Sequence, residues 1–322
     1  MTRTAIADFV ASTPRPSDFV AFWQQARSDL EAIPASISSE REPLRSTERV
    51  ETFAIRFTSL GKARIFAWLC LPRGKTGCPG LLLPPGYSGV PSLPRAWAEL
   101  GFAALQVSPR GHHRSDGEVA PGFPGYMTAG IEDPRAYIYR GAYCDVWRAV
   151  DVLLQCPEVD SSRIAVTGGS QGGALSLVAA AARPEIVAVA ADVPFLTGIR
   201  DSLRLGSSYP YEEINDYIRQ YPEREVHVLT TLDYVDTLNF ADSVRVPTLL
   251  SAGLSDDVCP PETAYALYNR LQCPKEIRAY PNTGHEGGGL THMLVKQTWL
   301  TIQLNVDATA EAHSFNLMAR AR

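Results

Sequence analysis

Six residues from Gly168 to Gly173 contain the pattern G-x-S-x-G, with Ser170 at its centre. A short apolar run at 163–167 precedes the pattern and an alanine-rich run at 174–182 follows it, which predicts a strand, a sharp turn and a helix. The flanking glycines allow the strained backbone of such a turn, which presents the serine hydroxyl at the start of the helix. We therefore predict that Ser170 is a nucleophile. The structural alternative is a glycine-rich helix start that Ser170 caps.

A serine hydroxyl becomes a good nucleophile only when a neighbouring base takes its proton. In a strand–turn–helix site of this kind, the acid and then the base follow the serine along the chain. Four histidines come after the serine, namely His227, His285, His292 and His313. His285 stands in a loop at 281–287, directly after a predicted strand at 276–280, whereas His227 and His292 fall in predicted helical segments. We therefore predict that His285 is the base.

Two adjacent aspartates are candidates for the carboxylate that orients this base. Asp256 and Asp257 both follow a predicted strand at 246–252. Neighbouring residues cannot both face His285, and Asp257 is well placed to cap the helix predicted at 262–271. Spacing favours Asp256 and leaves Asp257 open. The carboxylate would hold the imidazole in one tautomer and stabilise the imidazolium ion.

Acyl transfer also requires two N–H groups that face the oxygen on which negative charge develops. The backbone of Gln171, at the start of the helix, would supply one. The loop after a predicted strand at 80–83 would supply the other. This loop begins with two prolines, which have no N–H, so Gly86 and Tyr87 are the candidate donors.

The elements around these residues predict an α/β fold. Two alternating segments at 50–57 and 63–71 indicate antiparallel strands, and strands and helices then take turns along the chain. Further strands are predicted at 80–83, 102–107, 163–167, 187–192, 246–252 and 276–280, and helices at 96–100, 144–154, 174–182, 262–271 and 290–304. We expect one domain over residues 1–322, with a mostly parallel central sheet covered by helices on both faces.

Three segments lie outside this alternation. An N-terminal extension at 1–45 holds a helix with one apolar face, formed by Phe19, Phe22, Trp23, Ala26 and Leu30. A Gly/Pro-rich segment at 111–140 carries several aromatic residues and is too long for a plain connection. Helical patches with several tyrosines at 195–242 predict a cap over the site.

The composition is that of an ordinary globular protein, with 45% hydrophobic and 20% charged residues. A net charge of −5 gives no reason to expect nucleic acid as a partner, and no apolar run is long enough to span a membrane. The first residues do not form a signal peptide. Six scattered cysteines, without a Cys/His cluster, indicate reduced thiols in the cytoplasm and no structural metal.

The chain resembles carbohydrate esterase family 7, the acetyl xylan esterases and cephalosporin C deacetylases of the α/β-hydrolase superfamily. The matching motifs cover almost the whole sequence in order. They are Gly86-Tyr87, Arg110-Gly111, Met127 to Ile131, Tyr139-Arg140-Gly141, Gly168 to Gly173, Gly253 to Asp256 with Cys259-Pro260-Pro261, and Gly284-His285-Glu286.

The resemblance implies a role for each candidate residue. Ser170 would be the nucleophile, Asp256 the acid and His285 the base, with the main-chain N–H groups of Tyr87 and Gln171 binding the oxyanion. It implies no cofactor and no metal, and small acylated substrates such as acetylated oligosaccharides. It also implies a homo-oligomer, usually a hexameric ring, in which the segment 111–140 makes subunit contacts.

The sequence departs from the family pattern in three places. Pro85 replaces a histidine before Gly86-Tyr87, and His112 replaces a glutamine after Arg110-Gly111. Three glycines, 287–289, follow Glu286 where the family places an aromatic residue. These changes remove no catalytic group and leave open the shape of the pocket and the contact of residue 112. A peptidase or other acyl hydrolase on the same fold, or a silent binding protein, is the alternative function.

Overall fold

The structure is a computed structural model, and it describes residues 6–89, 92–117, 119, 121–122 and 124–306. Over these residues the centre is a nine-stranded sheet with the order β1-β2-β3-β5-β4-β6-β7-β8-β9. The strands are β1 (Ser38–Arg41), β2 (Val50–Thr58), β3 (Arg64–Pro72), β4 (Cys78–Leu83), β5 (Ala103–Ser108), β6 (Val159–Gly169), β7 (Ile186–Asp192), β8 (Thr248–Gly253) and β9 (Lys275–Tyr280). Strands β1, β2, β3 and β5 pair antiparallel, and the rest of the sheet is parallel.

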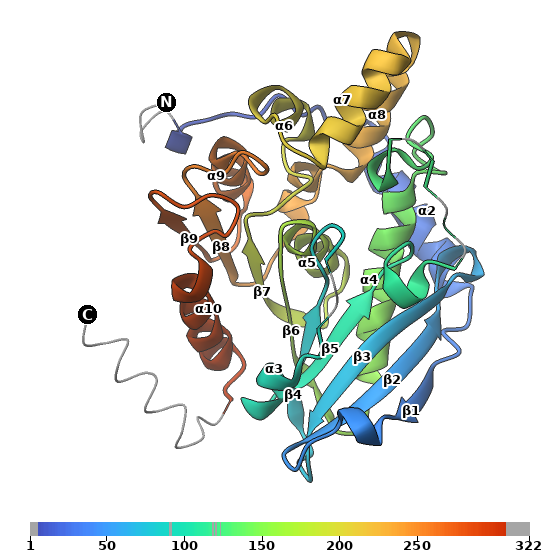
Figure 1. Cartoon of the computed structure of the whole chain (residues 1–322), viewed down its shortest axis with the longest axis vertical. Helices are drawn as coiled ribbons and strands as arrows, with labels where there is room; N and C mark the ends of the chain where they lie inside the picture. The colour runs from blue at the N-terminus through green and yellow to red at the C-terminus, as the bar shows by residue number, and fades with distance from the viewer. Residues whose placement is uncertain (1–5, 90–91, 118, 120, 123, 307–322) are drawn as a thin grey trace.

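Helices cover both faces of this sheet (Figure 1). They are α2 (Phe19–Glu31), α3 (Arg95–Glu99), α4 (Ile138–Leu154), α5 (Gln171–Ala182), α6 (Ile199–Leu205), α7 (Tyr211–Gln220), α8 (Glu225–Val235), α9 (Pro261–Arg270) and α10 (Gly289–Gln303). The larger core cluster joins α2, α4, α5 and α9 to one face, and a smaller cluster joins α3 and α10 to the other. The predicted α/β architecture is therefore confirmed.

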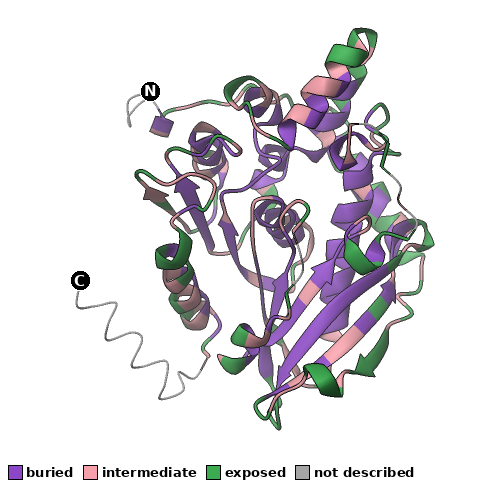
Figure 2. Ribbon diagram, in the orientation of Figure 1, coloured by how far each residue is buried: buried purple, intermediate pink, exposed green. Residues whose placement is uncertain are grey.

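Burial explains why the sequence pattern identified most elements. The middle of β6 is fully buried and reads as a continuous apolar run, as in parallel sheets covered on both faces. Helix α5 is apolar almost all round because the sheet and other helices enclose it. Helix α2 buries only the one face that the spacing predicted. Figure 2 shows the same contrast, with a buried sheet interior and exposed outer edges.

Two elements differ from the prediction. Strand β1 is exposed along its whole length, so it carries no apolar pattern that a sequence could reveal. Helix α4 begins at Ile138, six residues before the predicted start. Gly141 lowers the helix propensity of that first turn. A Cβ at Gly141 would lie 2.3 Å from Nη1 of Arg110, so the glycine makes room for that side chain.

The segment 195–242 forms α6, α7 and α8, which gather at the upper end of the molecule in Figure 1. The segment 111–140 contains 3₁₀ turns at His113–Ser115 and Tyr126–Thr128 and the first residues of α4. Among the described residues, no helix combines the length and apolarity needed to cross a membrane.

Candidate active site

Ser170 stands at the junction of β6 and α5 with a backbone φ of 57° and ψ of −122°. This strained conformation is held by the sheet, because the Ser170 N–H donates to the carbonyl of Asp192 at 2.9 Å. A Cβ at Gly168 would lie 2.6 Å from the backbone of Gly172, so only glycine fits there. The glycines therefore permit the sharp turn that the pattern predicted.

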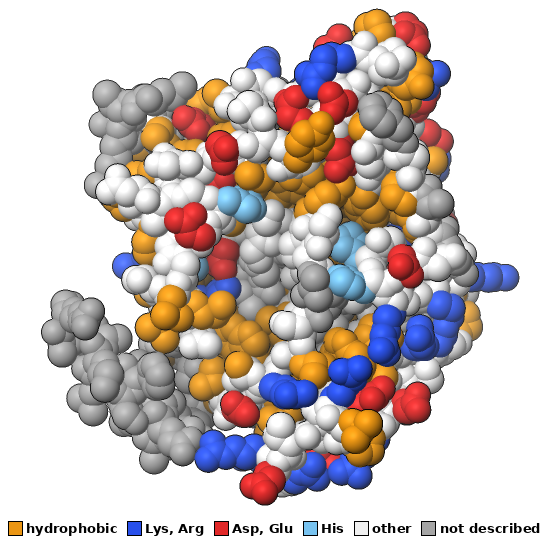
Figure 3. All heavy atoms as spheres, in the orientation of Figure 1, with side chains coloured by type: hydrophobic (Ala, Val, Ile, Leu, Met, Phe, Trp, Pro, Cys, Tyr) orange, Lys and Arg blue, Asp and Glu red, His pale blue; other side chains and the backbone are white. Residues whose placement is uncertain are grey.

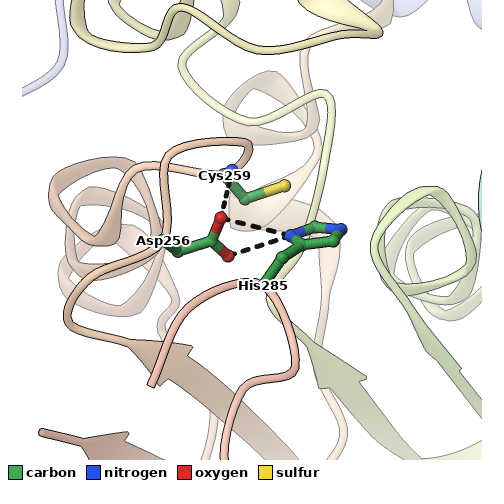
Figure 4. Close-up of side chains that lie close together, drawn as sticks. All are labelled: Asp256, Cys259 and His285. Atoms are coloured by element: carbon green, nitrogen blue, oxygen red, sulfur yellow. Dashed lines mark hydrogen bonds and ion pairs between the residues drawn. The ribbon is translucent and has the colours of Figure 1, made fainter. Parts of the chain in front are cut away.

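His285 lies in the loop between β9 and α10 and faces Asp256 (Figure 4). Its Nδ1 is 3.0 Å from Asp256 Oδ2 and 3.2 Å from Oδ1. Asp256 is fully buried at its side chain, and Oδ1 also accepts the N–H groups of Val258 and Cys259 at 2.9 and 2.8 Å. These two backbone donors hold the carboxylate in its orientation independently of the imidazole.

The adjacent aspartate points elsewhere. Asp257 is exposed, and its carboxylate accepts the hydroxyl of Ser208 at 2.8 Å. It does not cap α9, whose N-cap residue is Pro260. The spacing of the sequence left Asp257 open as the partner of His285. In the structure Asp256 contacts His285, and Asp257 does not.

The other histidines after the serine have different surroundings. His227 is exposed on α8. His292 is buried on α10, where Nε2 lies 2.8 Å from Asp192 and Nδ1 lies 2.9 Å from the Tyr280 hydroxyl. His313 lies outside the described residues.

Cys259 links the serine to this pair. Its thiol lies near the Ser170 hydroxyl and its main-chain N–H donates to Asp256, and burial raises the pKa of the thiol well above its usual value. Ligand atoms of Asp256, Cys259 and His285 lie within 4.8 Å of one another, a spacing that a metal ion could use. However, a buried thiol resists forming thiolate, and the Asp256 carboxylate is already occupied by three donors. The arrangement suits a hydrogen-bonded pair better than a metal centre.

The loop after β4 lies directly against the serine. A Cβ at Gly86 would be 4.0 Å from the Cβ of Ser170, and one at Gly172 would be 2.4 Å from the carbonyl oxygen of Pro84. Gln171 is the first residue of α5, so its N–H belongs to the free donors of a helix start. The structure thus brings together the segments that carry both candidate N–H donors.

The side chain of Gln171 is held by a buried chain of hydrogen bonds that the sequence analysis did not predict. The Tyr139 hydroxyl donates to Gln171 Oε1 at 2.7 Å. Gln171 Nε2 lies 3.1 Å from Nε2 of His112 and 3.4 Å from the Pro85 carbonyl. Burial lowers the pKa of His112, which favours the neutral ring. Residue 112, one of the departures from the family pattern, therefore contacts the residue after the nucleophile.

Tyr87 is held through its side chain by helix α7. Its hydroxyl donates to Glu213 Oε1 of α7 at 2.5 Å, and the other carboxylate oxygen accepts the Met127 N–H at 3.0 Å. Burial and the Glu213 carboxylate raise the pKa of the Tyr87 hydroxyl, so it stays protonated and donates. No sequence signal pointed to Glu213, because its partners lie far from it along the chain.

A hollow opens near the centre of the face shown in Figure 3. Beside the serine turn, a cavity of about 240 Å³ is lined by the loop 83–86, Gly168, and side chains of α3 and α10 that include Trp97 and Met293. Ser170 itself is half-buried. Ser170 is thus partly exposed, but neither it nor Asp256 nor His285 lines this cavity.

This sheet order, with a strained serine after β6 and an Asp–His pair after β8 and β9, defines the α/β-hydrolase class. The chain belongs to the acetyl xylan esterase (AXE1) family, whose model matches residues 1–302.

Individual relatives agree with this assignment. The acetyl xylan esterase of Paenibacillus sp. R4 shares 34% identity, with a TM-score of 0.87 over 94% of this chain and 99% of that one. Acetyl xylan esterase 1 of Thermoanaerobacterium sp. JW/SL YS485 shares 30% identity, with a TM-score of 0.86 and the same coverage. Acetyl esterase Axe7A of Xylanibacter ruminicola is 29% identical over 287 residues, or 85% of this chain. The chain spans 64% of the length of that curated relative.

Proposed function

We propose that the protein is a serine esterase that removes short acyl groups, acetyl first, from acetylated sugars or similar small alcohol esters. The observation that carries this proposal is the buried Asp256 carboxylate on Nδ1 of His285, with Cys259 close both to this pair and to the strained Ser170. The names of the family and of its relatives support acetyl esters as substrates.

In the proposed mechanism, the Ser170 hydroxyl attacks the acyl carbon while His285 Nε2 takes its proton. Asp256 keeps Nδ1 protonated and stabilises the imidazolium ion that forms. The oxyanion binds the main-chain N–H groups of Tyr87 and Gln171. His285 then protonates the leaving alcohol, and water releases the acid from the acyl-enzyme by the same steps in reverse. These steps use no cofactor.

The test is Ser170→Ala, assayed on p-nitrophenyl acetate with the folded, purified variant. We expect kcat to fall by a factor on the order of 10⁶, which leaves only the contribution of binding and the oxyanion site. A loss smaller than tenfold would show that another group is the nucleophile. A fluorophosphonate probe should label the wild type and not the variant, since a silent binding protein would not react.

The substrate class has its own measurement. A panel of acetyl, butyryl and peptide substrates should show the highest kcat/KM for acetyl esters. A strong preference for peptide substrates would show that the protein is a peptidase on the same fold and not an esterase. We further propose a cytoplasmic homo-oligomer, a hexameric ring, in which the segment 111–140 makes subunit contacts.

A further inference from the structure

A second cavity, of about 420 Å³, lies on the β2–β3 side of the molecule, away from the serine turn. Four arginines line it, namely Arg56, Arg64, Arg110 and Arg114. Figure 3 shows a group of basic side chains at the lower right, over the region of β2 and β3 in Figure 1. We call this cavity the arginine pocket.

Two of these arginines stack on one aromatic ring. The guanidinium carbons of Arg56 and Arg114 lie 5.2 and 5.0 Å from the ring centroid of Phe66. Arg114 also lies 5.1 Å from the ring of Trp68. Stacking fixes the flat face of a guanidinium group and leaves its edge N–H groups free for an acceptor. The Phe66 ring therefore holds two positive charges near the same cavity.

Among the described residues, Arg56 and Arg114 have no carboxylate partner. Glu118, between the lining residues Gly117 and Val119, lies outside the described residues. Arg64 donates only to neutral oxygens, those of the Thr58 hydroxyl at 2.8 Å and the Ser36 carbonyl at 3.2 Å. Arg110 is the exception, because it pairs with a buried carboxylate, Asp145, at 2.7 Å.

The backbone that carries Arg114 is rigidly attached to the sheet. The Ser115 hydroxyl accepts the N–H of Phe66 at 2.8 Å, and the Ser115 carbonyl accepts the N–H of Gly111 at 2.8 Å. These bonds fix the main chain next to Arg114, which lowers the entropy cost of ordering that part of the pocket on binding.

We propose that the arginine pocket binds an oxyanion, a carboxylate or a phosphate, carried by a molecule of small size. Guanidinium groups that line one cavity and pair with no described carboxylate, as those of Arg56, Arg64 and Arg114 do, raise the local positive potential, and they offer forked N–H pairs that match such anions. A carboxylate would come from an acidic sugar and a phosphate from a free ion or a phosphorylated metabolite. This proposal does not depend on the proposed esterase activity.

The test is isothermal titration of the full chain with sodium sulfate, sodium phosphate and sodium glucuronate at matched ionic strength, with xylose as the neutral control. We expect at least one of the anions to bind with one site per chain and a Kd on the order of 1 mM or tighter. Xylose should give no heat. Tighter binding of glucuronate than of phosphate would identify an acidic sugar as the ligand. Tighter binding of phosphate would identify a free phosphate ion or a phosphorylated metabolite.

The variants Arg56→Gln and Arg114→Gln should each weaken binding, and the double variant should weaken it at least tenfold. Arg41→Gln is the matched control, since Arg41 lies on the same part of the sheet but is paired with Glu51 at 2.8 Å. Equal binding by the double variant and the wild type, or no anion binding at all, would overturn the proposal. So would a double variant that changes the oligomer mass and leaves anion binding intact, because the arginines would then be subunit contacts.

Discussion

At the scale of single residues, Asp256 illustrates how the fold prepares one side chain for one task. Its carboxylate is buried, and two backbone N–H groups hold Oδ1 while His285 Nδ1 faces both oxygens. An asparagine of the same shape would present an N–H₂ group to some of these donors and would favour the wrong imidazole tautomer.

We therefore expect Asp256→Asn to lower kcat on p-nitrophenyl acetate by about 10⁴, the effect known for this change in serine triads. Asp257→Asn is the matched control, because Asp257 is exposed and bonds Ser208 instead. It should keep kcat within about twofold. Equal losses in the two variants would contradict the assignment of Asp256 as the orienting carboxylate.

His112 should give the folded protein a pH dependence. Nδ1 lies 3.3 Å from the carbonyl of Arg110, and Nε2 faces the amide of Gln171. The charges of two neighbours act on the pKa of the ring in opposite directions: His113 lowers it and Asp145 raises it. Burial lowers the pKa in the folded state below the ordinary value of 6.5. As pH falls below about 6.5, the unfolded chain takes up a proton that the folded chain does not, so stability falls.

This effect should disappear in His112→Gln, whose amide can still bond Gln171. From pH 7 to pH 5, the free energy of unfolding in urea should fall further for the wild type than for the variant, by about 1.4 kcal/mol for each unit by which the pKa is lowered. His227→Gln, at an exposed position on α8, should keep the pH dependence of the wild type. Parallel curves for His112→Gln and the wild type would show that His112 does not titrate differently in the two states.

At the scale of elements, Glu213 joins three parts of the chain. It is buried on α7, accepts from Tyr87 in the loop after β4, and accepts from Met127 in the segment 111–140. The space is closed around it, since a Cβ at Gly125 would lie 2.2 Å from its carboxylate. Helix α7 therefore helps to position the loop that carries a proposed oxyanion donor.

Tyr87→Phe should consequently lower kcat about tenfold with little change in KM, because a displaced oxyanion donor weakens binding of the transition state more than binding of the ester. The main-chain N–H is kept, so complete loss of activity is not expected. Tyr209→Phe is the matched control: it also removes a tyrosine–carboxylate hydrogen bond, but one within the segment 195–242, from an exposed ring to Asp216 at 2.6 Å. A change in KM alone, or equal effects in both variants, would contradict this positioning role.

The sequence predicted the elements well where one physical pattern decided them. Apolar runs identified β4 and β6, because strands buried on both faces are apolar throughout. The spacing of Phe19 to Leu30 identified α2, because a helix buried on one face repeats its apolar residues with the helical period. The exposed strand β1 left no such period. The start of α4 was missed because Gly141 lowers the helix propensity of its first turn, and the space that the glycine leaves for Arg110 depends on the folded structure.

The candidate site shows the same limit. Ser170, Asp256 and His285 each follow a strand in a recognisable pattern, so all three were predicted from the sequence. The residues that hold their surroundings were not. Tyr139 meets Gln171 across 32 positions, and Glu213 meets Tyr87 across 126. Such pairs depend on how the chain folds back on itself, and a local pattern contains no information on that.

At the scale of the whole molecule, the proposed ring makes a prediction about mass. Size-exclusion chromatography with light scattering should give about six times the 35.1 kDa of one chain. Ala136 is exposed in the segment 111–140, which the family resemblance assigns to subunit contacts. Ala136→Arg should therefore yield smaller particles that stay folded, because a charge placed in a contact between subunits loses its hydration without gaining a partner. Ala21→Arg, at an exposed position on α2, should leave the mass unchanged. A monomeric wild type, or Ala136→Arg particles of wild-type mass, would contradict the proposal that the segment 111–140 makes subunit contacts.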